Sequence, residues 1–180
     1  MRYLIVGNGP AGTTAAEHIR ANDPRGGITV VTEERLPFYS RIRLVDYLAG
    51  EAAEEELVLK APRWYEENGI ALSLGTRAAS LDTARKALST SSGEPYAYDK
   101  LLLATGGRSF VPPIEGAGKK GVFTLKTIED ARALREYSRD AEDVAIIGGG
   151  VLGLEIGNAL LKAGMKVSVV EFFPRLLPRQ

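Results

Sequence analysis

The order of apolar runs and turn residues at the start of the chain predicts a β-α-β unit. Residues 3–6 form a short apolar run that Gly7 closes, and residues 11–20 have the pattern of a helix. The turn-rich segment NDPRGG follows, and residues 28–31 then read as a buried strand. Two strands joined by a helix within about 30 residues are typical of a parallel, doubly wound sheet with a right-handed crossover.

The middle of the chain changes from a helical to a strand-like pattern. The segment LPFYSRIRLVDYLAG begins as a loop and continues as a helix, and PRWYEENG predicts a second helix that Gly69 ends. Four short β-like pieces follow, IALSL, AASLD, KALST and YAYD, and their spacing predicts an antiparallel meander. The next segment, KLLLATGG, is predicted to be an apolar strand that ends in glycines.

A break at Pro112 and Pro113 divides the chain into two predicted domains, residues 1–112 and residues 113–180. In the second domain, the helix predicted within residues 127–140 has Thr127 as its N-cap and acidic residues in its first turn. It leads into the strand DVAII, and a further strand over residues 167–171 completes a second β-α-β unit.

Each β-α-β unit carries the spacing G-x-G-x-x-G directly after its first strand. The first glycine permits a tight turn, the second lets the backbone approach a diphosphate, and the third lets the helix pack close to the strand. The helix N-terminus offers N–H groups and a partial positive charge, so a diphosphate can bind there without a basic side chain. The glycines are Gly7, Gly9 and Gly12 in the first motif, with Pro10 near the helix start, and Gly148, Gly150 and Gly153 in the second. We therefore predict an α/β fold with two Rossmann-like βαβ dinucleotide-binding units, the first with an inserted antiparallel β-meander.

An acidic residue follows the second strand of each unit, where a carboxylate can accept both hydroxyls of a ribose. In the first unit Glu33 and Glu34 compete for this role, and Glu33 is favoured because it directly follows the strand. In the second unit the candidate is Glu171, whose charge would repel a 2′-phosphate and select NADH. Arg175 and Arg179 lie just downstream and keep NADPH as an alternative. A tight strand-to-helix turn without a ligand is the other interpretation of either motif.

The composition excludes several classes of function. Lys and Arg total 23, as do Asp and Glu, so no net charge draws the chain to nucleic acid or to an acidic membrane. No apolar run reaches the roughly 18 residues of a spanning helix, and the N-terminus has no signal-peptide pattern, so we expect a cytoplasmic location. The chain has no Cys and one His, which excludes disulfides and cysteine metal sites and makes any metal site at His18 unexpected.

Five ordered segments cover essentially the whole chain: GNGPAG, LPFYSRIRL, YDKLLLATGGRSFVPPIEG, VAIIGGGVLGLEIGNAL and VSVVEFFPRLLPRQ. With them the sequence resembles the FAD-dependent pyridine nucleotide-disulfide oxidoreductase superfamily. It is most similar to the NADH-dependent reductases of rubredoxin and ferredoxin and to the flavin-binding part of assimilatory nitrite reductases. The resemblance implies a flavoprotein that takes hydride from NADH, with residues 1–112 as part of an FAD-binding domain and residues 113–180 as the start of an NAD(P)H-binding domain.

The resemblance also implies the residues of two cofactor sites and no indispensable acid or base. For FAD these are Gly7, Gly9, Pro10, Ala11 and Gly12 at the pyrophosphate, Glu33 at the adenosine ribose, Ala78 at the adenine, Arg41 beside the pyrophosphate and flavin, and Ala104, Thr105 and Gly106 at the border of the site. For NADH they are Gly148, Gly150, Leu152 and Gly153 at the pyrophosphate, Glu155 near the nicotinamide, and Glu171 at the ribose.

The sequence departs from the family pattern in two places. Without cysteine no thiol relay can form, so electrons must pass from the flavin directly to an external acceptor: a small electron-transfer protein, dioxygen or a haem partner. Many ferredoxin-reductase relatives have a Lys where this chain has Asp46, and that Lys pairs with the acid at the position of Glu155. Two acids are therefore expected to repel one another if they lie close together.

The family members are considerably longer than 180 residues, so the resemblance implies a truncated enzyme. An isolated chain is then expected to bind FAD weakly or not at all and to oxidise NADH poorly, because half of the flavin pocket would be missing. The alternative interpretation is a non-catalytic module that binds a nucleotide or a partner without electron transfer.

Overall fold

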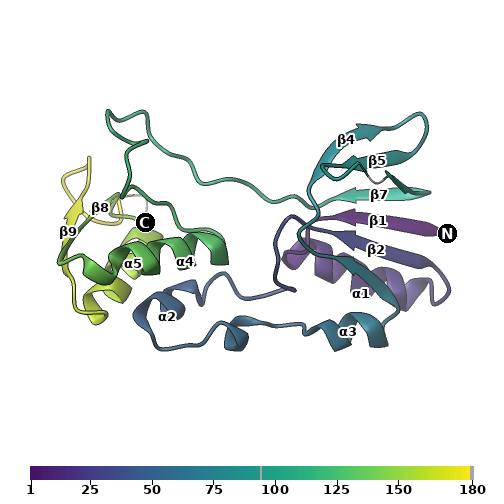
Figure 1. Ribbon diagram of the computed structural model, residues 1–180, viewed down its shortest axis with the longest axis horizontal. Helices are drawn as coiled ribbons and strands as arrows, with labels where there is room; N and C mark the ends of the chain where they lie inside the picture. Colours follow the sequence, from purple (N-terminus) through teal and green to yellow (C-terminus); the bar gives the residue numbers. More distant parts are fainter. Residues whose placement is uncertain (94, 179–180) are drawn as a thin grey trace. The chain divides into compact units, whose positions relative to one another are not determined.

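The computed structural model describes residues 1–93 and 95–178, which form two compact units. The first unit combines residues 1–39 with residues 58–107, and the second combines residues 40–57 with the described residues from 108 onward (Figure 1). The chain therefore passes between the units after Tyr39, after Leu57 and after Gly107. The predicted boundary at Pro112 and Pro113 separates an FAD-binding domain from an NAD(P)H-binding domain. The division into compact units does not test this assignment, which stays a prediction.

The first unit is built on a four-stranded parallel sheet in the order β3-β2-β1-β7. Its strands are β1 (Arg2–Val6), β2 (Gly27–Val31), β3 (Ile70–Ser73) and β7 (Lys100–Leu103), and its helices are α1 (Pro10–Asn22) and α3 (Pro62–Glu67). In the central register Ile5 of β1 lies between Val30 of β2 and Leu102 of β7. The predicted doubly wound α/β arrangement is confirmed.

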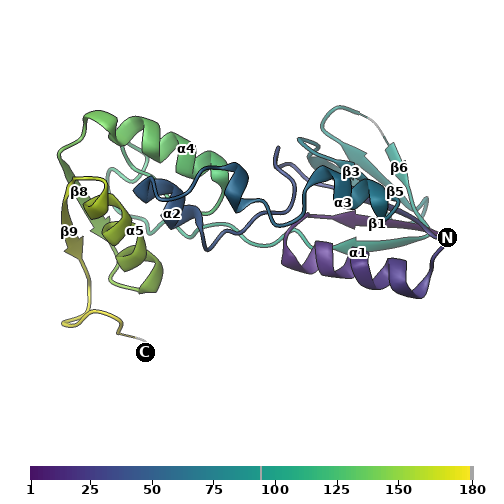
Figure 2. The ribbon, with the colours of Figure 1, turned by 90° about the horizontal axis from the view of Figure 1, so that it is seen from below.

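Both faces of this sheet are covered at the central strands β1 and β2, which suits their mainly apolar residues. Ile5 belongs to a cluster with Ala16 of α1 and Tyr65 of α3 on one face. Its neighbours Leu4 and Val6 belong to a cluster with Leu88 and Tyr98 on the other face. That second face is covered by an antiparallel sheet of β4 (Ala78–Asp82), β5 (Ala87–Thr90) and β6 (Pro95–Ala97). Figure 2 shows α1 on one side of the parallel sheet and β5 and β6 on the other.

The prediction that the segment IALSL belongs to the antiparallel meander is wrong. Its residues form β3, which pairs in parallel with β2 so that Ile28 lies opposite Ile70. The Thr32 N–H also donates to the Ser73 carbonyl, at 3.0 Å. A short strand has the same apolar pattern whether it belongs to the parallel or to the antiparallel sheet. Its partner strand is decided by contacts with residues that are distant in the sequence.

Arg20 ties the end of α1 to two other parts of the first unit. Its guanidinium donates to the carbonyls of Asn68 and Gly69 after α3 at 2.7 and 2.9 Å. The same group donates to the carbonyls of Pro24 and Gly26, both at 2.9 Å, in the turn before β2. One guanidinium near the C-terminus of α1 thus donates hydrogen bonds to several carbonyls that lie in turns, outside the helices and strands.

The second unit contains a two-stranded parallel sheet and three helices. The strands are β8 (Asp143–Ile147) and β9 (Lys166–Val170), and the helices are α2 (Leu44–Ala49), α4 (Ile128–Tyr137) and α5 (Val151–Lys162), with one-turn helices η1 (Glu55–Leu57) and η2 (Ser138–Asp140). The predicted cap of α4 is confirmed, because the Thr127 hydroxyl accepts from the Asp130 N–H and the Asp130 carboxylate accepts from the Thr127 N–H. The second predicted β-α-β unit is present as β8-α5-β9.

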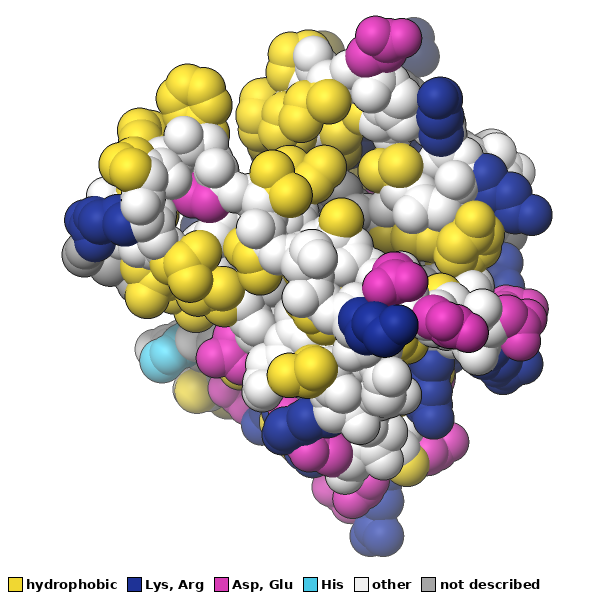
Figure 3. Space-filling view, turned by 90° about the vertical axis from the view of Figure 1, so that its left-hand side faces the viewer, with side chains coloured by type: hydrophobic (Ala, Val, Ile, Leu, Met, Phe, Trp, Pro, Cys, Tyr) yellow, Lys and Arg dark blue, Asp and Glu magenta, His cyan; other side chains and the backbone are white. Residues whose placement is uncertain are grey.

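Exposed hydrophobic side chains are frequent on the second unit, as the yellow surface in Figure 3 shows. They lie on β8, β9, α5 and the segment after β9: Ile147, Val151, Leu152, Leu161, Val169, Val170, Phe172, Phe173 and Leu176. Within residues 1–93 and 95–178, no helix is long and apolar enough to cross a membrane, and no group of acidic, His or Cys side chains could hold a metal ion.

Residues 40–57 form an excursion, which we call the arm, that leaves the first unit and joins the core of the second. At its base in the first unit, Tyr39 pairs with Val58 in an isolated bridge. In the second unit α2 of the arm packs against both α4 and α5, and Leu44 and Leu48 are buried. The arm is therefore a structural part of the unit that contains the second glycine motif.

Candidate functional site

The first glycine-rich loop joins β1 to α1 and contacts the end of β7. Gly7 has φ of 111°, a conformation that favours glycine, and its N–H donates to the Val31 carbonyl at 2.8 Å. A Cβ on Gly7 would lie 2.2 Å from the Ala104 oxygen. The Ala104 N–H itself donates to the Val6 carbonyl at 2.8 Å, so the predicted ATG segment, Ala104 to Gly106, begins directly against this loop.

The other two glycines of this loop differ in what surrounds them. Gly12 is packed so closely that a Cβ would lie 2.0 Å from the Gly7 oxygen. Gly9 is the N-cap of α1, with Pro10 in the first turn, and its backbone is extended with φ of −82° and no side-chain cap. A Cβ on Gly9 would meet no atom within 4 Å. Open space therefore lies at the helix N-terminus, where the first-turn N–H groups have no intrahelical acceptor.

The second glycine-rich loop repeats this geometry although its sequence shares only the glycines. Gly148 has the same φ of 111°, and its N–H donates to the Val170 carbonyl at 2.8 Å. Gly150 is the uncapped N-cap of α5, and a Cβ there would meet no atom within 4 Å. A Cβ on Gly153 would lie 2.2 Å from the Gly148 oxygen. Both loops thus fit a diphosphate, each with a close-packed third glycine and an open second one.

In the first unit, Glu33 is the more accessible of the two candidate acids. Its carboxylate is exposed and lies 3.8 Å from the Arg77 Nε. The Glu34 carboxylate instead accepts a hydrogen bond from the Tyr39 hydroxyl. These contacts favour Glu33 for the ribose. Arg77 precedes Ala78, the first residue of β4, and no pattern in the sequence indicates that it faces Glu33.

In the second unit, Glu171 lies against the glycine-rich loop. Its Oε2 accepts from the Gly149 N–H at 2.7 Å, and its Oε1 accepts from the Phe173 N–H at 3.0 Å. The Leu177 N–H donates back to the Gly149 carbonyl at 2.9 Å. The segment after β9 therefore folds over the loop and orients the acid there. Arg175 and Arg179 are the two arginines for which NADPH remained an alternative cofactor. Arg175 donates to the Pro178 carbonyl, and Arg179 lies outside the described residues.

Ala78 begins β4 in the first unit, and its role at the adenine stays a prediction. Three other predicted residues, Arg41, Leu152 and Glu155, lie in the second unit. Arg41, on the arm, donates to the Lys126 carbonyl at 2.6 Å, so its role beside the flavin stays a prediction. Leu152 and Glu155 lie exposed in the N-terminal half of α5. The roles predicted for Leu152 at the pyrophosphate and for Glu155 near the nicotinamide also stay predictions.

Two cations lie near the acids Asp46 and Glu155, and the expected repulsion between these acids stays a prediction. Asp46 pairs with Arg43 at 3.1 Å. Lys162 binds Glu51 at 2.7 Å, and this hydrogen bond and charge raise the pKa of the lysine, with smaller contributions from the charges of Asp46 and Glu155. Lys162 of α5 therefore lies in a locally acidic environment to which Asp46 and Glu155 contribute.

Comparison with known proteins agrees with this geometry. The family model described as pyridine nucleotide-disulphide oxidoreductase matches residues 1–180. The chain is 39% identical to a rubredoxin-NAD(+) reductase of Pseudomonas putida, covering 99% of this chain and 47% of the relative. It is 36% identical to the nitrite reductase (NADH) large subunit of Escherichia coli K12, covering 100% of this chain and 21% of the relative.

Among solved structures, a covalent putidaredoxin reductase–putidaredoxin complex matches with a TM-score of 0.87 at 36% identity, covering 99% of this chain and 44% of the other. The chain thus spans about half or less of the length of these relatives.

Proposed function

Because the chain belongs to the pyridine nucleotide-disulphide oxidoreductase family, we propose that it is part of an oxidoreductase that takes electrons from NADH through FAD. The first glycine-rich loop is assigned to FAD and the second to NADH. One observation carries this proposal: one chain has two strand-to-helix loops of the same backbone geometry, each with open space at its second glycine. Two such loops suit two dinucleotides rather than one.

The residues of the chain bind and orient these cofactors. At each loop the first-turn N–H groups of α1 or α5 hold a diphosphate, and Gly9 or Gly150 leaves room for it. Glu33 and Glu171 accept the ribose hydroxyls. A bound flavin supplies the hydride and electron chemistry, and the protein contributes position and electrostatics.

The proposed electron acceptor is a small electron-transfer protein. The chain contains no cysteine, so it offers no thiol of its own to carry electrons away from the flavin. Among its relatives are a reductase of rubredoxin and a reductase solved with putidaredoxin, which supports an acceptor of this class. Oxygen consumption measured with and without such a protein distinguishes this acceptor from dioxygen.

The test is titration of the chain with FAD and with NADH, each alone and then together, by calorimetry and visible absorbance. We expect two sites that do not compete, with weak FAD binding because the chain spans about half or less of its relatives' length. Any bound flavin should lose absorbance slowly when NADH is added without oxygen. Competition for a single site, or no nucleotide binding, would contradict the proposal. Binding at both sites without loss of flavin absorbance would favour the non-catalytic module instead.

The proposed preference for NADH depends on the charge of Glu171. Glu171→Gln keeps an oxygen near the Gly149 N–H but removes the charge that would repel a 2′-phosphate. We expect the ratio of NADPH to NADH affinity to rise about tenfold, equivalent to ~1.4 kcal/mol. The matched variant Glu33→Gln, in the first unit, should leave this ratio unchanged. Equal ratios in wild type and Glu171→Gln would show that another group selects the cofactor.

A further inference from the structure

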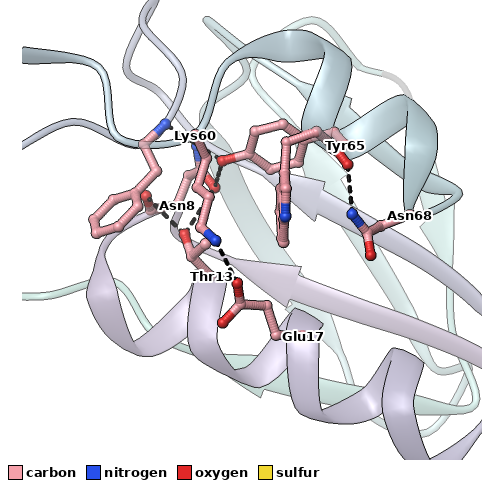
Figure 4. Close-up of polar contacts among 8 residues, drawn as sticks. Asn8, Thr13, Glu17, Lys60, Tyr65 and Asn68 are labelled. Carbon is pink, nitrogen blue, oxygen red and sulfur yellow. Dashed lines mark hydrogen bonds and ion pairs between the residues drawn. The ribbon is translucent and has the colours of Figure 1, made fainter. Parts of the chain in front are cut away.

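A buried polar relay lies behind the first glycine-rich loop (Figure 4). The Phe38 N–H donates to the Tyr65 hydroxyl oxygen at 3.3 Å, and the Tyr65 hydroxyl donates to Asn8 Oδ1 at 2.9 Å. Asn8 stands between the first two glycines of the loop, and Tyr65 lies on α3. The Thr13 hydroxyl of α1 lies 3.4 Å from the same Asn8 oxygen. The relay therefore connects the loop to α3 and to the chain before the arm.

The Asn8 amide lies with its oxygen toward Tyr65. The Tyr65 oxygen accepts from the Phe38 N–H, and the Tyr65 hydroxyl donates its proton to Asn8 Oδ1. Its Nδ2 is buried and has no hydrogen-bond partner among the described residues. A buried amide without a partner is destabilising, and such groups are rare in folded proteins.

The second loop shows that this side chain is not needed for the loop conformation. At the position that corresponds to Asn8, the second loop has Gly149, which has no side chain to form a relay. Gly7 and Gly148 nevertheless have the same φ of 111°. The second loop is contacted through its backbone instead, by Glu171 and Leu177. Asn8 thus adds an unfavourable buried group to a loop that can adopt its shape without one.

The position of Tyr65 makes it a rigid anchor. Its side chain is buried in the core cluster under the sheet, and its ring packs edge-on against Trp64 with ring centres 4.9 Å apart. Trp64 in turn lies under the Lys60 ammonium, 4.5 Å from the ring centre, and Lys60 binds Glu17 of α1 at 2.6 Å. Because the Tyr65 ring is fixed by this packing, its hydroxyl can limit the motion of Asn8, the loop residue that it contacts.

We propose that Tyr65, acting through Asn8, is a positioning residue that holds the first loop ready for the diphosphate of FAD. This inference rests on the proposed function of the first loop. Pre-organising a binding loop raises affinity because less motion is lost when the ligand binds. The second loop lacks this relay, which suits a cofactor that must leave after each turnover. The Asn8 Nδ2 is itself too buried to touch a ligand, so the relay acts through the loop backbone.

The test is a double-variant cycle with Asn8→Ala, Tyr65→Phe and the two combined. We expect each single variant to raise the Kd for FAD about tenfold, which corresponds to ~1.4 kcal/mol. The double variant should lose no more than the single ones, because both remove the same relay. Tyr96→Phe is the matched control, since its hydroxyl donates to the Ser73 hydroxyl of β3 at 3.1 Å and is not part of the relay. Tyr96→Phe should leave the Kd for FAD unchanged. None of these variants should change the Kd for NADH.

Hydrogen exchange of the ligand-free protein provides a readout that does not need the cofactor. Amides of Gly9 and of residues 11–13 should exchange faster in Asn8→Ala and Tyr65→Phe than in wild type or Tyr96→Phe. Unchanged exchange and unchanged FAD affinity in folded variants would overturn the inference, as would losses that simply add in the double variant. If wild type binds no FAD at all, the proposed function fails, and the exchange comparison still decides whether the relay stiffens the loop. If Tyr65→Phe does not fold, Asn8→Ala alone decides the question.

Discussion

Replacing Gly9 with Ala should leave the first unit folded but weaken FAD binding about 100-fold, equivalent to ~2.7 kcal/mol. The backbone of Gly9 is extended, so any residue can adopt it, and a Cβ there meets no protein atom within 4 Å. The methyl group would instead fill the open space at the N-terminus of α1 that the diphosphate is proposed to occupy. A calorimetric titration with FAD and a thermal unfolding curve measure the two effects separately.

Gly12→Ala is the contrasting variant. Its Cβ would lie 2.0 Å from the Gly7 oxygen, so the loop or the helix must move, and we expect a loss of stability on the order of 3 kcal/mol. Gly150→Ala, at the open glycine of the second loop, should weaken NADH binding and leave FAD binding unchanged. The proposal of two separate diphosphate sites would be wrong if Gly9→Ala bound FAD like wild type, or if Gly150→Ala affected both cofactors equally.

The two loops could be predicted from the sequence because their constraints are local. Gly7 needs a positive φ, and Gly12 and Gly153 need space that only a missing side chain leaves. Such demands follow from the spacing of a few residues along one strand, one turn and one helix. The cap of α4 at Thr127 is equally local, and it too was predictable.

The features that sequence analysis missed depend on residues far apart in the chain. The pairing of β3 with β2 joins residues separated by the arm and α3. The relay from Tyr65 to Asn8 crosses 57 positions, and the ion pair between Lys162 and Glu51 crosses 111. In each case the apolar pattern is the same whether or not the contact forms, so periodicity carries no signal for it. Only the packing of the folded chain decides these partners.

The arm has a consequence for the residues proposed to bind cofactors. Arg41 precedes α2 on the arm, and the arm is held in the second unit by several contacts besides its apolar side chains. Arg132 of α4 binds the Glu54 carboxylate through two nitrogens, and the Arg135 guanidinium lies over the Tyr47 ring, 4.8 Å from its centre. Residues assigned to FAD by family resemblance are therefore divided between the two units. Under this proposed assignment, the binding of FAD would depend on the stability of the unit that is proposed to bind NADH.

Leu44→Ala should destabilise the second unit by about 3 kcal/mol, the usual range for removing a fully buried leucine side chain. Leu44 is only 1% exposed and begins α2, which packs against α4 and α5. Because the arm contributes to this core, we expect amides of α5 to exchange with solvent markedly faster in the variant. Amides of β1, in the first unit, should exchange as in wild type. Hydrogen exchange read by mass spectrometry distinguishes the two.

Leu59→Ala provides the matched control, since it removes the same atoms from a side chain that is 54% exposed just beyond the arm. It should change neither stability nor exchange in α5. If Leu44→Ala behaved like Leu59→Ala, the arm would lie on the surface of the second unit rather than form part of its core. If it instead loosened β1 and left α5 protected, the arm would belong energetically to the first unit. The expected pattern, loss confined to α5 and its neighbours, would show that the helix after the second glycine-rich loop depends on a segment inserted from the first unit.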